Sequence, residues 1–223
     1  MGEAIGQVLS LGVGVALSPI PIIGVILMLA TPRARQNGLA FVLGWIAGLA
    51  GAGTIVLLAS SGADASEGGG PADWVSVLKV ILGLLLLVVA LKQWRGRPRP
   101  GEEAAMPKWM QTIDQFQPPK AAGLALLLSA VNPKNLLLVV GAAAAIAQTG
   151  TSAGNQAVAL AVFVAIGTLG PGAPVAIYFA MGERSKRLLD ELRAWMAHNN
   201  AVIMAVLCLL IAAKLIGDGI SGF

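Results

Sequence analysis

Six apolar runs, each of about 20 residues or more, restrict the possible folds of this chain more than any other feature. A helix needs about 20 apolar residues to cross the hydrocarbon core of a bilayer. Backbone groups cannot stay unpaired in lipid, so such runs are interpreted as helices. We therefore predict an all-α membrane protein with six transmembrane helices, at residues 4–30, 37–60, 74–94, 119–148, 154–181 and 198–217.

The composition favours lipid over water as the surroundings of these helices. Hydrophobic residues make up 57% of the 223 residues and charged residues 12%, whereas soluble domains carry about 25% charged residues. The net charge of +4 does not indicate a nucleic-acid partner, because most of the bases sit in short connectors between apolar runs. Cys208 is the only cysteine and is interpreted as a small buried hydrophobe, so an internal disulfide is excluded.

Basic residues alternate between the connectors, and this alternation predicts the orientation of the chain. The connectors after the first, third and fifth runs contain lysine or arginine, whereas those after the second and fourth contain neither. Basic connectors stay on the cytoplasmic side of a membrane. We therefore predict a multi-pass plasma-membrane protein with both termini outside. In the basic connectors, residues 106–116 and 185–196 are each predicted to form an amphipathic helix in the membrane interface.

Proline breaks occur at matching positions in the first and fourth runs. A proline inside a helix removes a backbone hydrogen bond, and paired breaks in two halves are typical of a transport site. Runs one and four cross in opposite directions, so we predict two inverted three-helix repeats, at 1–94 and 119–223, joined by a basic connector at 95–118. The first helix of each repeat is broken. The break residues are Ser18, Pro19, Pro21, Asn132, Pro133, Lys134 and Asn135.

Two further motifs concern the second and fifth runs. Residues 167–174 predict a third break, at which Thr168, Gly170 and Pro171 either contact a ligand or serve packing alone. Gly44 and Gly48 form a GxxxG pair, which indicates close helix packing and also makes a homodimer plausible.

Lys134 is the one charged residue predicted to lie deep in the membrane, and no aspartate or glutamate lies deep in any run. A central lysine costs about 2.5–3.5 kcal/mol on insertion scales. Its partner is either an anionic substrate group or a carbonyl freed by Pro19 or Pro133. Lys79 and Lys214, toward the outer side, are predicted to snorkel. If they face the same cleft as Lys134, they instead form an outer anion site.

At these residues the chain resembles the lysine exporter superfamily, which has six helices in two inverted halves, a proline motif in the first helix and Asn-Pro-Lys in the fourth. Ser-Pro-Ile-Pro at 18–21, the long basic third connector and Gly-Pro-Gly-Ala-Pro at 170–174 are more similar to its GAP branch. These are the peptidoglycolipid or sulfolipid addressing proteins of actinobacteria. The resemblance implies a role in carrying envelope lipids outward, and it carries over Pro19, Pro21, Asn132, Pro133 and Lys134.

The leading hypothesis is a transporter that exports lipids or glycolipids of the cell envelope, with Lys134 engaging an anionic head group. One alternative is an exporter of a small solute such as an amino acid. A second is a non-transporting accessory subunit of a lipid-export machinery. We predict no enzyme activity, metal or cofactor, because no cluster of His, Asp, Glu or Cys shares one depth.

Overall fold

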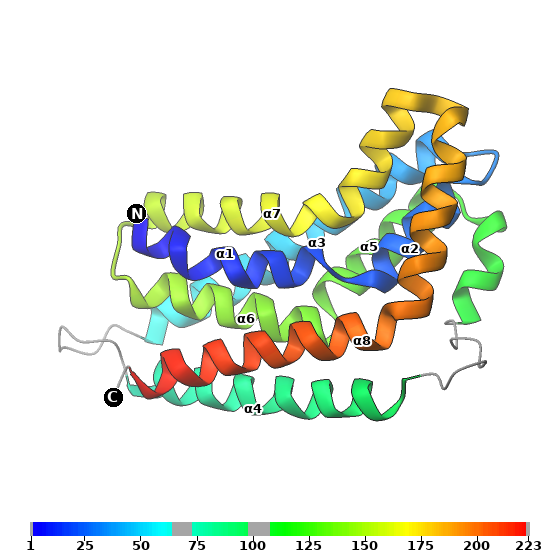
Figure 1. Ribbon diagram of the computed structural model, residues 1–223. Helices are drawn as coiled ribbons and strands as arrows, with labels where there is room; N and C mark the ends of the chain where they lie inside the picture. The colour runs from blue at the N-terminus through cyan, green and yellow to red at the C-terminus, as the bar shows by residue number, and fades with distance from the viewer. Residues whose placement is uncertain (1, 64–72, 98–107, 222–223) are drawn as a thin grey trace.

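The computed structural model describes residues 2–63, 73–97 and 108–221, and within these ranges it is all-helical, which confirms the predicted class. Figure 1 shows a bundle in which α1, α4, α6 and α7 run alongside one another. The elements are α1 (Gly2–Ala16), α2 (Pro19–Leu29), α3 (Ala34–Ala63), α4 (Asp73–Arg95), η1 (Lys108–Gln115), α5 (Pro118–Ala130), α6 (Pro133–Gln148), α7 (Ala153–Met181), η2 (Gly182–Arg184) and α8 (Ser185–Ile220).

Three helical stretches are long and apolar enough to cross a membrane. They are Ala34–Ser60, Val75–Arg95 and Ala153–Ile220. Two bent pairs also qualify when each is taken as one span: α1 with α2, bent by 46°, and α5 with α6, bent by 62°. The described residues therefore give three to five spans by length and composition. The predicted count is six, and the difference lies in Ala153–Ile220, which forms one helical stretch around a turn at Gly182.

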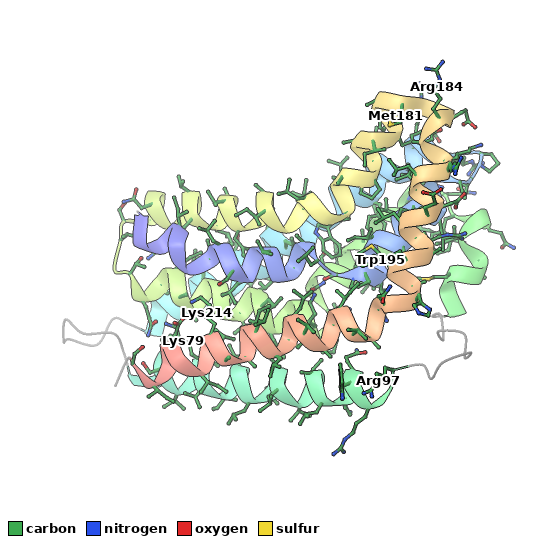
Figure 2. All side chains as sticks on the ribbon, in the orientation of Figure 1. Lys79, Arg97, Met181, Arg184, Trp195 and Lys214 are labelled. Atoms are coloured by element: carbon green, nitrogen blue, oxygen red, sulfur yellow. The ribbon has the colours of Figure 1, made fainter. Side chains whose placement is uncertain are left out.

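The two ends of the bundle are formed by different segments of the chain. Figure 1 shows the start of α1 and the end of α8 at one end, and the α2–α3 and α7–α8 turns at the other. In Figure 2, Arg97 and Arg184 lie at the end with the turns, and Lys79 and Lys214 near the end with the termini. The placement of both termini at one end agrees with the predicted topology, and their being outside stays a prediction.

The two predicted connector helices differ from each other in the structure. Of residues 106–116, the structure describes 108–116, of which Lys108–Gln115 form the 3-10 helix η1. Met110 and Ile113 are 8% and 2% exposed, because they pack into the core beside α2. Met110 and Ile113 thus pack on protein, and the placement of η1 in the membrane interface stays a prediction. Residues 185–196 do form a helix, the first part of α8, which crosses the end of the bundle in Figure 1.

The GxxxG pair of α3 packs against α5 of the same chain. A Cβ placed on Gly44 would lie 2.2 Å from the carbonyl oxygen of Ala122, and one on Gly48 would lie 2.0 Å from Ser129 Oγ. The close packing predicted from Gly44 and Gly48 is therefore correct. This face is already covered, so the pair no longer supports a homodimer, which stays an untested prediction.

Gly44→Ala is expected to destabilise the protein, because its methyl group meets backbone atoms of α5 that cannot rotate away. The loss should be about 1–3 kcal/mol, the usual cost of overpacking. Gly51 is the matched control, since it lies on the same helix with nothing within 4 Å of its Cβ position. Gly51→Ala should be neutral or stabilising by up to about 1 kcal/mol. Thermal unfolding in detergent measures both, and equal midpoints would contradict the assigned contact.

Candidate functional site

The chain leaves the helical conformation immediately before Pro19 and again before Pro133. Proline disfavours the α conformation in the residue that precedes it. Ser18 accordingly has φ −91° and ψ 106°, and Asn132 has φ −58° and ψ 123°. Pro19 and Pro133 then start α2 and α6, where their missing N–H groups leave no helical bond unmade. Pro21 is also buried in the first turn of α2, so the Pro-Ile-Pro motif begins a helix at the first predicted break.

Side chains satisfy the carbonyls that the first break leaves without helical donors. Pro19 has no N–H to give to the carbonyl of Val15, and Ser18 Oγ donates to that oxygen at 2.7 Å instead. One turn before Ser18, the carbonyl oxygen of Gly14 accepts from Lys134 Nζ, also at 2.7 Å. Lys134 belongs to the first turn of α6, so this bond joins the two breaks.

The second break is satisfied in a corresponding way. The carbonyl oxygen of Leu128 accepts from Asn135 Nδ2 at 2.9 Å. Leu128 stands five residues before Pro133, as Gly14 stands five before Pro19. Asn132 Oδ1 caps α6 by accepting from the backbone N–H of Lys134 at 3.1 Å. Equivalent carbonyls at both breaks therefore receive their donors from consecutive residues of α6.

The ammonium of Lys134 is buried and has no acidic partner among residues 2–63, 73–97 and 108–221. Its side chain is 3% exposed, and Nζ donates to Gly14 O and Ser18 Oγ, each at 2.7 Å. None of the ion pairs among the described residues includes Lys134. An ammonium has three donors, so one N–H has no acceptor in the described part of the chain. The freed-carbonyl partner expected for Lys134 is present, and the anionic partner stays a prediction.

Helix ends add to the electrostatics of this site. The C-terminal end of α1 is the negative end of its dipole, and it faces the Lys134 ammonium through Gly14 O. The N-terminal ends of α2 and α6 lie at the same breaks, and such ends favour anions. The thiol of Cys208 on α8, 1% exposed as predicted, lies within electrostatic range of Lys134. The site is therefore positive and buried, and is suited to an anion rather than a cation.

The third predicted break is wrong, because α7 runs as one α-helix through Pro171 and Pro174. Pro171 has no N–H for the carbonyl of Gly167, but Trp45 Nε1 on α3 donates to that oxygen at 3.1 Å. Figure 1 shows α7 bending toward the end with the turns, as expected for a helix that contains prolines. The neighbouring α3 thus supplies the donor that allows the helix to continue.

The three candidate residues of α7 have different surroundings. Gly170 and Pro171 pack against protein, whereas Thr168 lines a groove. A Cβ on Gly170 would lie 1.8 Å from the carbonyl oxygen of Ala16, the last residue of α1, so Gly170 allows α7 to approach the first break. Pro171 is buried, and Thr168 Oγ1 donates to the carbonyl of Val164 and lines a groove between α3 and α7. No hydrogen bond among the described residues joins these three to Lys134.

Lys79 and Lys214 take separate partners near the end that carries the termini (Figure 2). The predicted snorkelling is wrong for Lys79, which is 4% exposed because α4 packs against α6 and Gln148 Oε1 accepts from its Nζ. Lys214, half-buried, pairs with Asp218 one turn later on α8. No contact given by the structure joins either lysine to the breaks, and an outer anion site formed by both stays a prediction.

Sequence reasoning missed Gly14 and Trp45 as members of these networks. Gly14 carries no side-chain signal, although counting back one turn from Ser18 identifies its carbonyl as free. Trp45 carries a clearer signal, since a buried indole N–H normally finds an acceptor. Pro171 leaves such an acceptor on Gly167, but only the fold shows that the two meet.

One family of known proteins matches almost the whole chain. The family described as Sap, sulfolipid-1-addressing protein, matches residues 8–221. This range includes both breaks, Lys134 and the groove between α3 and α7. No match was found among the curated proteins or among the solved structures.

Ser18→Ala is expected to destabilise the protein by about 1–3 kcal/mol, because it leaves Val15 O without a donor and removes an acceptor of Lys134. Ser129 is the matched control, since it is equally buried and its hydroxyl donates only to Leu126 O within its own helix. Ser129→Ala should cost less than about 1 kcal/mol. Unfolding of both variants in detergent tests the difference, and a smaller loss for Ser18→Ala would contradict the network.

Trp45→Phe keeps the ring of Trp45 largely in place but leaves Gly167 O without a donor, at a cost of about 1–3 kcal/mol. Pro171→Ala restores the backbone N–H that reaches this oxygen in a regular helix. The cost of Trp45→Phe should therefore fall by at least about 0.5 kcal/mol in the Pro171→Ala background. A double-mutant cycle of unfolding free energies measures this coupling. Additive losses would show that Trp45 does not compensate for Pro171.

Proposed function

The chain belongs to the family of sulfolipid-1-addressing proteins, and from this membership we propose that it translocates envelope lipids or glycolipids with an anionic head group across the plasma membrane. The observation that carries the proposal is the buried ammonium of Lys134, which has no carboxylate partner and one open N–H among the described residues. A phosphate, sulfate or carboxylate group supplies both an acceptor and a counter-charge.

Six spans in two inverted repeats are part of this proposal. The stretch Ala153–Ile220 has 68 residues, which at 1.5 Å each would be about 100 Å long, against a hydrocarbon core of about 30 Å. It therefore counts as two spans, α7 and α8, separated at Gly182, whose φ of +56° suits glycine. Helix packing supports two equivalent halves, since α1 packs on α7 as α5 packs on α3, and α2 on α8 as α6 on α4.

Transport through this site requires the bundle to open. Lys134 is 3% exposed, so a head group reaches the ammonium only when α1 separates from α6 near Gly14. The head group then replaces Gly14 O and Ser18 Oγ as the acceptor. Acyl chains stay in the bilayer while the head group crosses, so a closed polar pore is unnecessary.

The same burial favours a second candidate function, an accessory subunit of a lipid-export machinery. Lys134 already has two partners within the chain, and a lysine held in this way can lock the two breaks together without binding any substrate. The two functions differ in one respect: only a transporter moves lipid when it is the sole protein in a vesicle.

Lys134→Gln tests the transport function, because glutamine keeps an N–H donor for Gly14 O and removes the positive charge. The purified protein is reconstituted in vesicles that contain head-group-labelled phosphatidylglycerol or phosphatidylcholine, and flipping is followed by access of a membrane-impermeant quencher. We expect Lys134→Gln to slow phosphatidylglycerol flipping by at least about tenfold, the effect of about 1.4 kcal/mol. Arg187→Gln, an exposed change on α8, should leave the rate unchanged.

The other outcomes distinguish the alternatives. Wild-type protein that flips neither lipid supports the accessory subunit and contradicts transport by this chain alone. Uptake of labelled amino acids by the same vesicles, with no lipid flipping, would instead support a small-solute exporter. Equal flipping by wild type and Lys134→Gln would remove Lys134 from the mechanism, provided that both unfold at similar temperatures.

A further inference from the structure

A cavity with two arginines opens at the end of the bundle that carries the helix turns. Its volume is about 480 Å³. Arg33, in the turn before α3, and Arg35 and Gln36, in the first turn of α3, line one side, and Tyr178 of α7 lines the other. The cavity therefore lies at the α2–α3 turn, which Figure 1 shows at the end of the bundle opposite the start of α1.

In the described part of the chain, the two guanidinium groups have no acidic partners. Ion pairs among the described residues involve four other bases, and neither Arg33 nor Arg35 takes part in one. The guanidinium carbon of Arg35 lies 5.9 Å from the ring centroid of Phe179. Such a contact uses the flat face of the guanidinium and leaves its in-plane N–H groups free. These free donors match the oxygens of a phosphate or sulfate ester.

An apolar track follows Arg35 along the same face of α3. Leu39, Leu43 and Ile46 come four, eight and eleven residues after Arg35, a spacing that places all four side chains on one face of a helix. The three apolar side chains are 49%, 65% and 36% exposed, so they contact the surroundings rather than the core. The face of α3 beside the cavity is therefore apolar along its length.

The track ends in a groove between α3 and α7. The groove has a volume of about 550 Å³, begins at Ile46 and is walled by small or apolar side chains such as Ala50 and Ala161. Eleven residues of helix from Arg35 to Ile46 span about 16 Å, roughly half of the hydrocarbon core of about 30 Å. A lipid whose head group lies at the arginines therefore has an acyl chain of the right reach to enter the groove.

We propose that this cavity, track and groove form a binding site for one anionic lipid. The phosphate or sulfate ester of its head group contacts Arg33 and Arg35, and an acyl chain lies over Leu39 and Leu43 and ends in the α3–α7 groove. The site is separate from Lys134. The inference rests on the proposed function, since it gives the lipid substrate a place to bind before translocation, and it is tested by binding without transport.

Native mass spectrometry of the purified protein in detergent tests this site by measuring lipid binding. Phosphatidic acid, or phosphatidylcholine with the same acyl chains, is titrated into the protein. Arg33→Gln/Arg35→Gln should weaken phosphatidic acid binding by about tenfold and leave phosphatidylcholine binding unchanged. The matched control is Arg184→Gln/Arg187→Gln, which removes the same charge at the same end of the bundle. The control should bind both lipids as the wild type does.

A second pair of variants tests the position of the acyl chain. Ala161→Trp fills the groove and should weaken phosphatidic acid binding by several-fold, whereas Ala213→Trp, at an exposed position of α8, should not.

Equal binding by the arginine variant and its control would overturn the head-group site. Binding lost equally in both tryptophan variants would overturn the groove. Inorganic phosphate that binds as tightly as phosphatidic acid would show that the acyl chain adds no affinity, and would overturn a lipid ligand in favour of free phosphate.

Lys134→Gln separates this inference from the proposed function. Normal phosphatidic acid binding by Lys134→Gln supports a distinct site, even if wild-type protein flips no lipid in vesicles. In that case the transport proposal fails and the binding site stands. Loss of binding in Lys134→Gln to the extent seen in Arg33→Gln/Arg35→Gln would show one shared site and overturn the inference.

Discussion

Backbone carbonyls without helical donors, in the interior of an apolar bundle, determine how this protein is held together. No water is available in a bilayer core, and each unsatisfied backbone group costs several kcal/mol there. The prolines leave such carbonyls at both breaks and inside α7, and side chains supply the donors of four of them. The acceptors are Gly14, Val15, Leu128 and Gly167, and the donors are Lys134, Ser18, Asn135 and Trp45. The breaks are therefore cross-linked parts of the fold.

The energetics of Lys134 show why its charge is compatible both with holding the two breaks together and with binding an anion. A central lysine costs about 2.5–3.5 kcal/mol, and a hydrogen bond to a charged group contributes about 1.5–3 kcal/mol. The two bonds to Gly14 and Ser18 are thus sufficient to hold the ammonium in place without any anion. They do not neutralise it, since both acceptors are uncharged. The net charge remains for a ligand that reaches the site.

The conformational preferences of proline predicted where the helices break, but not which distant side chains supply donors to the freed carbonyls. The breaks before Pro19 and Pro133 follow from proline geometry alone, and the structure places both where the sequence predicts. The continuity of α7 depends on Trp45, which lies on another helix more than a hundred residues earlier in the chain. Lys79 shows the same limit, because its burial depends on Gln148 at the far end of α6. Contacts of this kind leave no periodic signal in a sequence.

Packing of α7 connects the deep site to the proposed lipid groove. Gly170 lies against Ala16, at the end of the helix whose carbonyl holds Lys134. Two residues earlier on the same helix, Thr168 lines the groove between α3 and α7. Because protein interiors are close-packed, a movement of α1 away from α6 either carries α7 with it or changes the contact between Gly170 and Ala16. In the proposed transport cycle, α7 is therefore the element through which opening of the Lys134 site would reach the groove.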